Sequence, residues 1–168
     1  MQLLLMRHGI AAPLDEKIRI DAARPLTEEG VEKTRQIVEG LRAAGIVLDF
    51  IATSPLLRAV QTAEVVRNTF DRSKTAPPLE TWPELEHAEY SALLQRLQNV
   101  KAADTVMLVG HEPGMSRLVA HLLTGSSDGF TLEFKKAGVC AMEVDFTATK
   151  PQAILLWHAT PKLLRLMS

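Results

Sequence analysis

Short apolar runs alternate with amphipathic stretches along most of the chain. The apolar runs have the length and composition of strands buried on both faces, at residues 2–6, 49–53, 79–82 and 105–109. Between them, apolar side chains recur with the period of a helix, at residues 28–44, 54–70, 90–100 and 113–123. This alternation predicts a mainly parallel sheet with helices on both faces.

The C-terminal part of the chain has a different pattern. Residues 130–134, 138–146 and 152–157 predict strands joined by hairpin-like links. We therefore expect antiparallel strands at one edge of the sheet, and the expected fold class is an α/β three-layer αβα sandwich. The chain has no internal repeat and no linker, so its 168 residues predict a single domain, 1–168.

The connecting segments carry signals of their own. Thr27 has a hydroxyl that can cap the helix that follows it. Ser54 and Pro55 predict a helix start, with a capping hydroxyl followed by proline at the first helical position. Residues 10–25 predict a surface loop at a strand end, and residues 73–83 predict a turn-rich connection.

Composition and charge exclude several classes of protein. The formal net charge is -1 and the isoelectric point is near 6.5, so bulk charge gives no nucleic-acid signal. No apolar run approaches the roughly 20 residues that cross a bilayer, and Arg7 follows the first run instead of preceding it as in a signal peptide. Cys140 is the single cysteine, so no internal disulfide can form, and the apolar residues around it predict that its side chain is buried. We expect a cytoplasmic protein that binds neither nucleic acid nor membrane.

Two histidines and two arginines follow the predicted strands. Arg7 and His8 come directly after the first strand, and His111 follows the strand at residues 105–109. Arg58 lies in the first turn of the helix after the second strand. Because ligands bind outside the carboxyl ends of strands in open α/β sheets, all four groups are predicted at one end of the sheet.

This set of side chains suits a phosphoryl group. Two arginines can pair with phosphate oxygens and balance the charge of a dianion. A neutral histidine can attack phosphorus with one ring nitrogen while the other donates a hydrogen bond to the backbone. His8 is the predicted nucleophile, His111 the second imidazole, and Gly9 leaves room for a tight turn beside the phosphate.

At this point the sequence resembles the histidine phosphatase superfamily, which is also called phosphoglycerate mutase-like. The matching pieces are LLLMRHG at residues 3–9, LTEEG at 26–30, SPLLRAVQTA at 54–63 and LVGHEPG at 108–114. They occur in the family's order, in the expected context of strands and helices. A lone RHG is a weak signal, whereas four ordered pieces are a specific one.

Within this family, the shortest members, the phosphohistidine phosphatases of the SixA type, resemble this chain. The likeness lies in the length, in the opening strand followed directly by RHG, and in the PEL tripeptide at residues 83–85. The resemblance implies that His8 is phosphorylated, that Arg7 and Arg58 hold the phosphate, and that His111 is the second pocket histidine. It also implies neither a metal nor an organic cofactor; His111–Glu112 superficially matches a zinc-binding HExxH motif, but Met115 replaces the second histidine.

The proton donor is the open question. Larger family members place an acidic residue between the second arginine and the second histidine, and the candidates here are Glu84, which we favour, and Glu86. An alcohol leaves poorly without a proton, whereas imidazole, with a pKa near ~6.5, leaves easily from a phosphoramidate. A small enzyme with a weak or missing acid is therefore expected to prefer phosphorylated histidine.

Three functions follow from these residues. The first is a protein phosphohistidine phosphatase, with a phosphorylated protein such as a phosphorelay histidine domain as its partner. The second is a phosphomonoesterase acting on a small sugar phosphate or nucleotide, with Glu84 as acid. The third is a phosphate-binding regulatory module without turnover.

Overall fold

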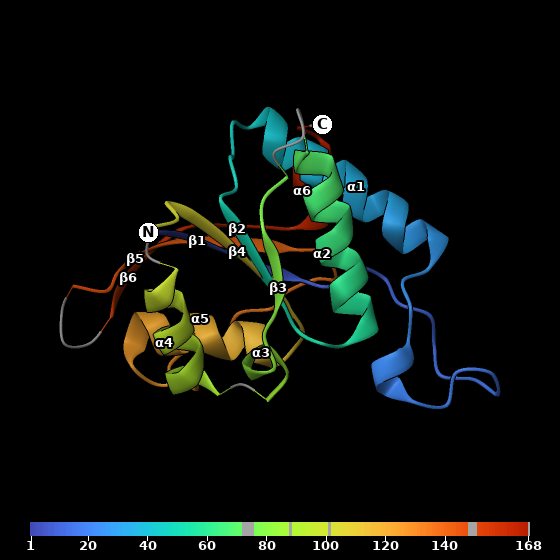
Figure 1. Cartoon of the computed structure of the whole chain (residues 1–168), viewed down its shortest axis with the longest axis horizontal. Coiled ribbons are helices and arrows are strands. Elements are labelled where there is room, and N and C mark those ends of the chain that lie inside the picture. Colours follow the sequence, from blue (N-terminus) through green and yellow to red (C-terminus); the bar gives the residue numbers. More distant parts are fainter. Residues whose placement is uncertain (72–75, 88, 101, 148–150, 168) are drawn as a thin grey trace.

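The computed structural model describes residues 1–71, 76–87, 89–100, 102–147 and 151–167. Its strands form one six-stranded sheet in the order β3-β2-β4-β1-β5-β6 (Figure 1). The strands are β1 (Gln2–Arg7), β2 (Phe50–Thr53), β3 (Leu79–Thr81), β4 (Thr105–Gly110), β5 (Val139–Asp145) and β6 (Gln152–Ala159). The helices are α1 (Glu28–Ala43), α2 (Leu57–Phe70), α3 (Glu84–His87), α4 (Tyr90–Asn99), α5 (Gly114–Thr124) and α6 (Pro161–Arg165), with a short 3-10 helix, η1, at Asp21–Ala23.

The sheet has the mixed topology that the sequence predicts. Neighbouring strands among β3, β2, β4 and β1 run parallel. Strand β5 pairs antiparallel with β1, and β6 pairs antiparallel with β5. The predicted α/β sandwich with antiparallel C-terminal strands is therefore confirmed.

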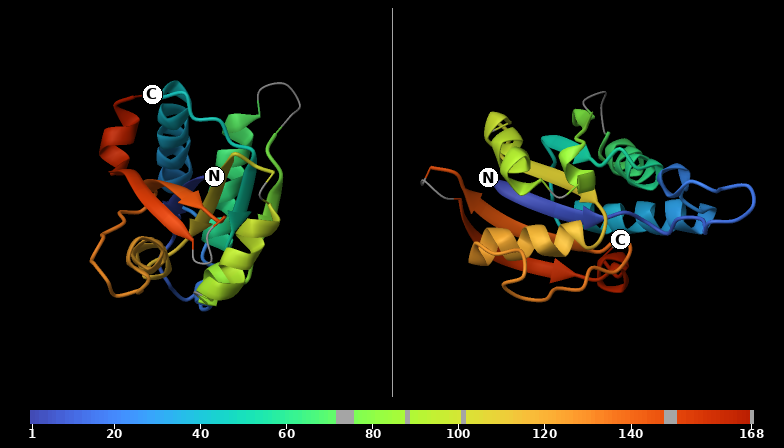
Figure 2. Two further views of the ribbon diagram at one scale, coloured as in Figure 1. Left: turned by 90° about the vertical axis from the view of Figure 1, so that its left-hand side faces the viewer. Right: turned by 90° about the horizontal axis from the view of Figure 1, so that it is seen from below.

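Helices cover both faces of the sheet and form two cores. One core packs α1, α2 and α6 against the sheet, and the other packs α3, α4 and α5 against the opposite face (Figure 2). Alternate residues of β1 serve the two cores: Leu3 and Leu5 point to one, Leu4 and Met6 to the other, and all four are fully buried. This two-sided burial explains why β1 is an uninterrupted apolar run.

The parallel strands bring distant segments to one edge. Arg7 pairs with Gly110, and Thr53 pairs with Val109, so β1, β4 and β2 end at the same level. The amide of His8 donates to the Gly110 carbonyl over 2.8 Å, which extends this alignment past the end of β1. The segments that follow β1, β2 and β4 are far apart in the sequence, but they leave the sheet side by side at this edge.

The structure corrects some predictions of local structure. Residues 130–134 form no strand, and α2 begins at Leu57 with Leu56 as its N-cap residue, so Ser54 does not cap it. Thr27 does cap α1, because its hydroxyl accepts a hydrogen bond from the Gly30 amide over 2.9 Å. Part of the expected connection, residues 73–75, lies outside the described residues.

The sequence pattern does not predict helices α3 and α6, since each is only about one turn long and has no measurable period. In the part of the chain that the structure describes, none of the helices is both long and apolar enough to cross a bilayer.

Candidate active site

The ring of His8 is held in one tautomer. Its Nδ1 lies 2.7 Å from the carbonyl oxygen of Gly9, and a carbonyl can only accept, so Nδ1 carries the hydrogen. Its Nε2 is therefore unprotonated, and the lone pair of this nitrogen accepts a hydrogen bond from Nε of Arg58 over 3.3 Å. Nε2 of His8 is therefore the nucleophilic nitrogen of this ring.

The surroundings of His8 keep the ring neutral. Burial lowers its pKa from 6.5 to about 4, and the nearby charges of Arg58, Arg7 and His111 act in the same direction, while the hydrogen bond to Gly9 opposes them. Only 6% of the residue is exposed. At neutral pH the ring is thus an uncharged base with an available lone pair.

This environment predicts an unusual titration of His8. We expect ring nitrogen NMR shifts to report the Nδ1–H tautomer at neutral pH, with a midpoint near pH 4 instead of 6.5. Between these two values the unfolded chain binds more protons than the folded one, so folding stability falls as pH drops from 6.5 towards 4. Denaturant unfolding should therefore show wild type losing stability against His8→Gln over this window. A midpoint near 6.5 would contradict the described environment.

Arg58 is fixed from two sides. It lies in the first turn of α2 and is 6% exposed. Besides the contact with His8, its Nη1 donates to the backbone carbonyl of Asp21 over 2.8 Å, and its Nη2 donates to Oδ2 of Asp21 over 2.9 Å. Hydrogen bonds from Arg24 and Arg58 lower the pKa of the Asp21 carboxyl, which stays charged. Asp21 therefore sets the plane of the guanidinium.

Arg7 and His111 each present an unpaired nitrogen. Nη1 of Arg7 donates to the Phe134 carbonyl over 2.7 Å, whereas its Nε is buried with no partner among the described residues. Burial lowers the pKa of His111, and a backbone hydrogen bond to Glu112 opposes that effect. Nε2 of His111 is also buried and unpartnered within the described residues. Buried polar nitrogens without partners are uncommon, and these two, one of them on Arg7 itself, suit an anion held together with Arg58.

The structure brings the four sequence-selected groups together. The charges of Arg58, Arg7 and His111 all act on the pKa of His8, and Arg58 also acts on that of His111. The juxtaposition of side chains from β1, α2 and the end of β4 agrees with the sequence expectation. Their chemical roles stay predictions.

The structure shows a packing reason for glycine at position 9. A Cβ at this position would lie 2.5 Å from Oγ1 of Thr34 and 3.3 Å from the Gly30 carbonyl, both on α1. The amide of Gly9 donates to Oγ1 of Thr62, a fully buried α2 residue, over 3.0 Å. Close packing against α1, together with the anchor on Thr62, fixes the segment that carries His8.

The two candidate acids have different environments. Glu84, the favoured one, pairs with Nε of Arg96 over 2.8 Å, and that guanidinium lies 5.5 Å from the ring centre of Trp82. Glu84 thus has a partner outside the histidine cluster. By contrast, the charges of Glu86 and Asp21 act on the pKa of His111, after the dominant effect of burial. The PEL motif points to Glu84, whereas the carboxylates whose charges act on His111 are Glu86 and Asp21.

Asp21 is the site residue that sequence reasoning missed. It lies in η1, within the predicted loop at 10–25, and it contacts Arg58 over 37 positions of sequence. No periodicity or motif on either side marks it. The only available signal was its place between the RHG and LTEEG pieces.

A cluster of two arginines and two imidazoles at the carboxyl edge of a parallel sheet defines a class of phosphate-binding, phosphoryl-transfer proteins. Residues 3–93 match the model of the histidine phosphatase superfamily, branch 1. The chain therefore belongs to the histidine phosphatase superfamily.

Relatives and solved structures agree with this family. Phosphohistidine phosphatase SixA of Escherichia coli K12 is 36% identical over 131 residues, covering 76% of this chain and 77% of that protein. A structure of the protein histidine phosphatase SixA complexed with tungstate aligns with a TM-score of 0.79 and 30% identity, over 98% of this chain and 99% of that one. The alpha-ribazole phosphatase of Shigella flexneri shares the fold, with a TM-score of 0.75 and 20% identity over 96% of this chain and 97% of that one. The chain is a phosphatase.

Proposed function

We propose that this phosphatase removes the phosphoryl group from a phosphorylated histidine on another protein, with Nε2 of His8 as the nucleophile. The observation that carries the proposal is the neutral His8 ring, whose Nδ1–H is held by Gly9 and whose Nε2 is left to attack. The Escherichia coli relative that bears the name phosphohistidine phosphatase supports the choice of substrate.

The substrate phosphoryl group binds among the cations. Arg7 and Arg58 supply fixed positive charges, and the buried Nε of Arg7 gains an acceptor when a phosphate oxygen approaches. An anion in the pocket also favours the protonated form of His111, which gives its Nε2 a hydrogen to donate. The entering phosphoryl group takes the place of Arg58 Nε as the partner of the His8 lone pair.

The reaction proceeds in two displacements. In the first, the His8 Nε2 lone pair forms a bond to phosphorus while the substrate P–N bond breaks. The leaving imidazole keeps that electron pair and departs neutral, because its other nitrogen already carries a proton. His8 is then a phosphorylated ring with a proton on Nδ1, and the Gly9 carbonyl stabilises its positive charge.

In the second displacement, water attacks phosphorus and the bond to His8 breaks. The electron pair returns to Nε2, the water gives up a proton to solvent, and inorganic phosphate leaves. His8 regains its starting tautomer without moving the proton on Nδ1. The hydrogen bond to Gly9 thus serves both steps.

The environment of the carboxylates favours a nitrogen leaving group. Glu84 is paired with Arg96, so a dedicated acid at that position has a competing partner. An alkoxide needs a proton as it leaves, whereas imidazole, with a pKa near ~6.5, does not. The pocket is therefore better suited to phosphoramidates than to phosphate esters.

A second candidate, a phosphomonoesterase for small phosphate esters, is supported by Glu86. Its charge acts on the pKa of His111, and its side chain is 32% exposed, so it is in contact with solvent. In this alternative Glu86 protonates the leaving alkoxide.

The test compares wild type and Glu84→Gln on two substrates, free phosphohistidine and a simple alkyl phosphate. We expect wild type to turn over phosphohistidine at least about 100-fold faster, since only the ester needs an acid. Glu84→Gln should change phosphohistidine turnover by less than about twofold, because the residue pairs with Arg96. Release of inorganic phosphate measures both.

Two outcomes would redirect the assignment. Faster hydrolysis of the alkyl phosphate by wild type would replace the phosphohistidine function with the esterase. A sharp loss of ester hydrolysis in Glu84→Gln, with none in Glu86→Gln, would restore Glu84 as the acid despite its ion pair.

A further inference from the structure

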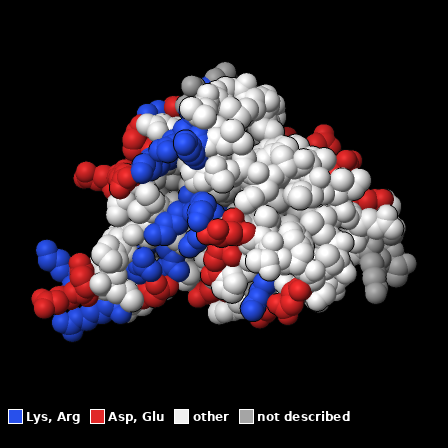
Figure 3. All heavy atoms as spheres, turned by 180° about the vertical axis from the view of Figure 1, so that it is seen from behind, with Lys and Arg blue, Asp and Glu red and all other residues white. Residues whose placement is uncertain are grey.

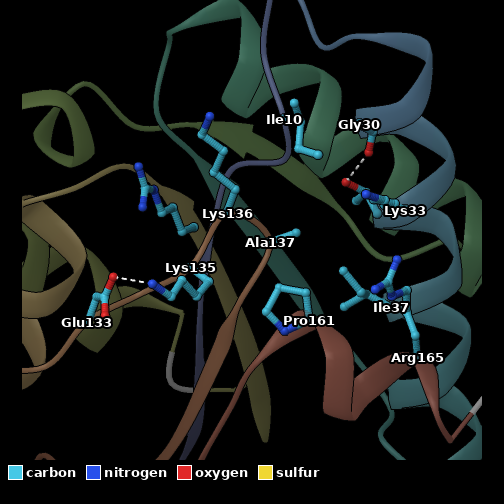
Figure 4. Close-up of a pocket in the computed structure, with 12 residues that line it drawn as sticks. Ile10, Gly30, Lys33, Ile37, Glu133, Lys135, Lys136, Ala137, Pro161 and Arg165 are labelled. Carbon is cyan, nitrogen blue, oxygen red and sulfur yellow. Dashed lines mark hydrogen bonds and ion pairs between the residues drawn. The ribbon is translucent and has the colours of Figure 1, made fainter.

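A basic cavity adjoins the proposed active site. It has a volume of about 460 Å³, and its charged lining consists of Arg7, Lys33, Glu133, Lys135, Lys136 and Arg165. Lys33 comes from α1, Arg165 from α6, and the two other lysines from the segment before β5, so the cations surround the space from several sides (Figure 4). We call this cavity the basic groove.

The basic groove concentrates positive charge that the whole chain lacks. Five cations face one carboxylate there, although the formal net charge of the chain is -1. Basic side chains gather beside a hollow on the face of the molecule opposite to that of Figure 1 (Figure 3). Lys33 pairs with Glu29 and Lys135 pairs with Glu133, whereas Lys136 is exposed and makes no ion pair or hydrogen bond to the described residues. Such a local excess attracts anions and accelerates their encounter.

The basic groove is tied to the pocket that holds His8. Arg7 belongs to both, since it lines the groove and its charge acts on His8. The amide of Ala137, another groove residue, donates to the carbonyls of Arg7 and His8, each over 3.0 Å. A ligand in the groove therefore lies directly beside a phosphoryl group held by Arg7.

We propose that the basic groove binds an acidic segment of the phosphoprotein substrate, next to its phosphorylated side chain. This inference rests on the proposed function and names a property of the partner: carboxylates close to the phosphorylated residue. Binding there raises the local concentration of substrate and orients the phosphoryl group towards His8.

The lining favours a peptide over an inorganic polyanion. Lys33 stands on α1, across the cavity from the lysines of the segment before β5, and each ammonium acts as a separate point charge, which suits several spaced carboxylates better than one compact anion. Ile10, Ile37 and Pro161 lie between the charged groups and offer apolar contact to a peptide's side chains and backbone. Inorganic phosphate has no apolar surface and gains nothing from such contact.

The first experiment measures binding directly. Fluorescence polarisation follows a short fluorescein-labelled peptide of glutamate and alanine on wild type, on Lys33→Gln/Lys136→Gln and on the control Arg117→Gln/Lys162→Gln. The control removes two exposed charges that do not line the groove. We expect the groove variant to weaken binding about tenfold and to flatten its salt dependence, and the control to stay within about twofold.

Two results would overturn the inference. One is equal peptide affinity, or no peptide binding, in wild type and groove variant. The other is lysine-dependent binding of inorganic tripolyphosphate without lysine-dependent binding of the peptide, which would assign the groove to a small polyanion.

The second experiment separates the groove from the proposed function. With a phosphohistidine peptide flanked by glutamates, the groove variant should raise KM about tenfold and leave kcat unchanged. With free phosphohistidine, which does not reach the groove, its kinetics should match those of wild type. If wild type hydrolyses neither substrate, the proposed function fails, while the polarisation result still decides whether the groove binds acidic peptide.

Discussion

Replacing His8 with alanine is expected to reduce phosphate release by about 1,000-fold or more, because the variant has no nitrogen to carry the phosphoryl group. The arginines and His111 remain, so the variant should still bind the substrate. Trapping with a radiolabelled phosphoryl donor should give an acid-labile, base-stable phosphoenzyme in wild type and none in His8→Ala. The combination of binding without transfer is the signature of a lost nucleophile.

The control for this prediction is His87→Ala. The side chain of His87 is 62% exposed, and its Nε2 lies 4.0 Å from Oε2 of Glu86. Its removal should therefore leave turnover within about twofold. Thermal melting checks the fold of both variants, and His8→Gln replaces His8→Ala if the smaller side chain destabilises the buried site. Turnover near the wild-type level in a folded His8 variant would remove His8 from the proposed role. A wild type that binds phosphate but forms no phosphoenzyme would support the regulatory module instead.

The sequence was most informative where burial is two-sided. Residues 2–6 are an unbroken apolar run because β1 lies in the middle of the sheet between two cores. A run of this kind has few structural interpretations other than a buried strand. Because β1 and β4 are parallel neighbours, His8 and His111, which follow them, lie at the same edge of the sheet. This part of the site could therefore be inferred without coordinates.

Residues 130–134 alternate like a strand but form none, and the sheet explains why. Strand β5 is already paired with β1 on one side and with β6 on the other, so the segment before β5 cannot pair with β5 itself. Its Phe134 instead packs edge-on against His158, with ring centres 5.0 Å apart, and its carbonyl accepts from Arg7. Local pattern cannot report that the neighbouring edges are taken.

The contacts of Asp21 and Glu84 show which parts of the site cannot be predicted from the sequence. The contact of Asp21 with Arg58 is a single long-range interaction from an irregular loop, and no period encodes it. The PEL tripeptide favours Glu84 as the acid, yet Arg96 on α4 forms an ion pair with it. Side chains on loops and short helices depend on tertiary packing that the sequence pattern does not specify.

Substituting Arg58 with lysine is expected to lower kcat/KM for phosphohistidine by about 100-fold while keeping the charge. Arg58 makes three directed contacts, through Nε to His8 and through Nη1 and Nη2 to Asp21. One ammonium group cannot reproduce this fork, so the charge would no longer be fixed beside His8. Steady-state kinetics measure the loss, and Arg117→Lys, at an exposed position on α5, serves as the matched control with no expected change.

Comparison with Arg58→Ala separates geometry from charge. In the alanine variant the Asp21 carboxylate loses its buried partner and faces the incoming phosphoryl group, so we expect a further loss of about tenfold beyond Arg58→Lys. Adding Asp21→Asn to Arg58→Ala removes that repulsion and should recover part of the loss, whereas adding it to wild type should not raise activity comparably. A lysine variant within about threefold of wild type would mean that charge alone suffices and that the fork held by Asp21 does not contribute to phosphoryl transfer.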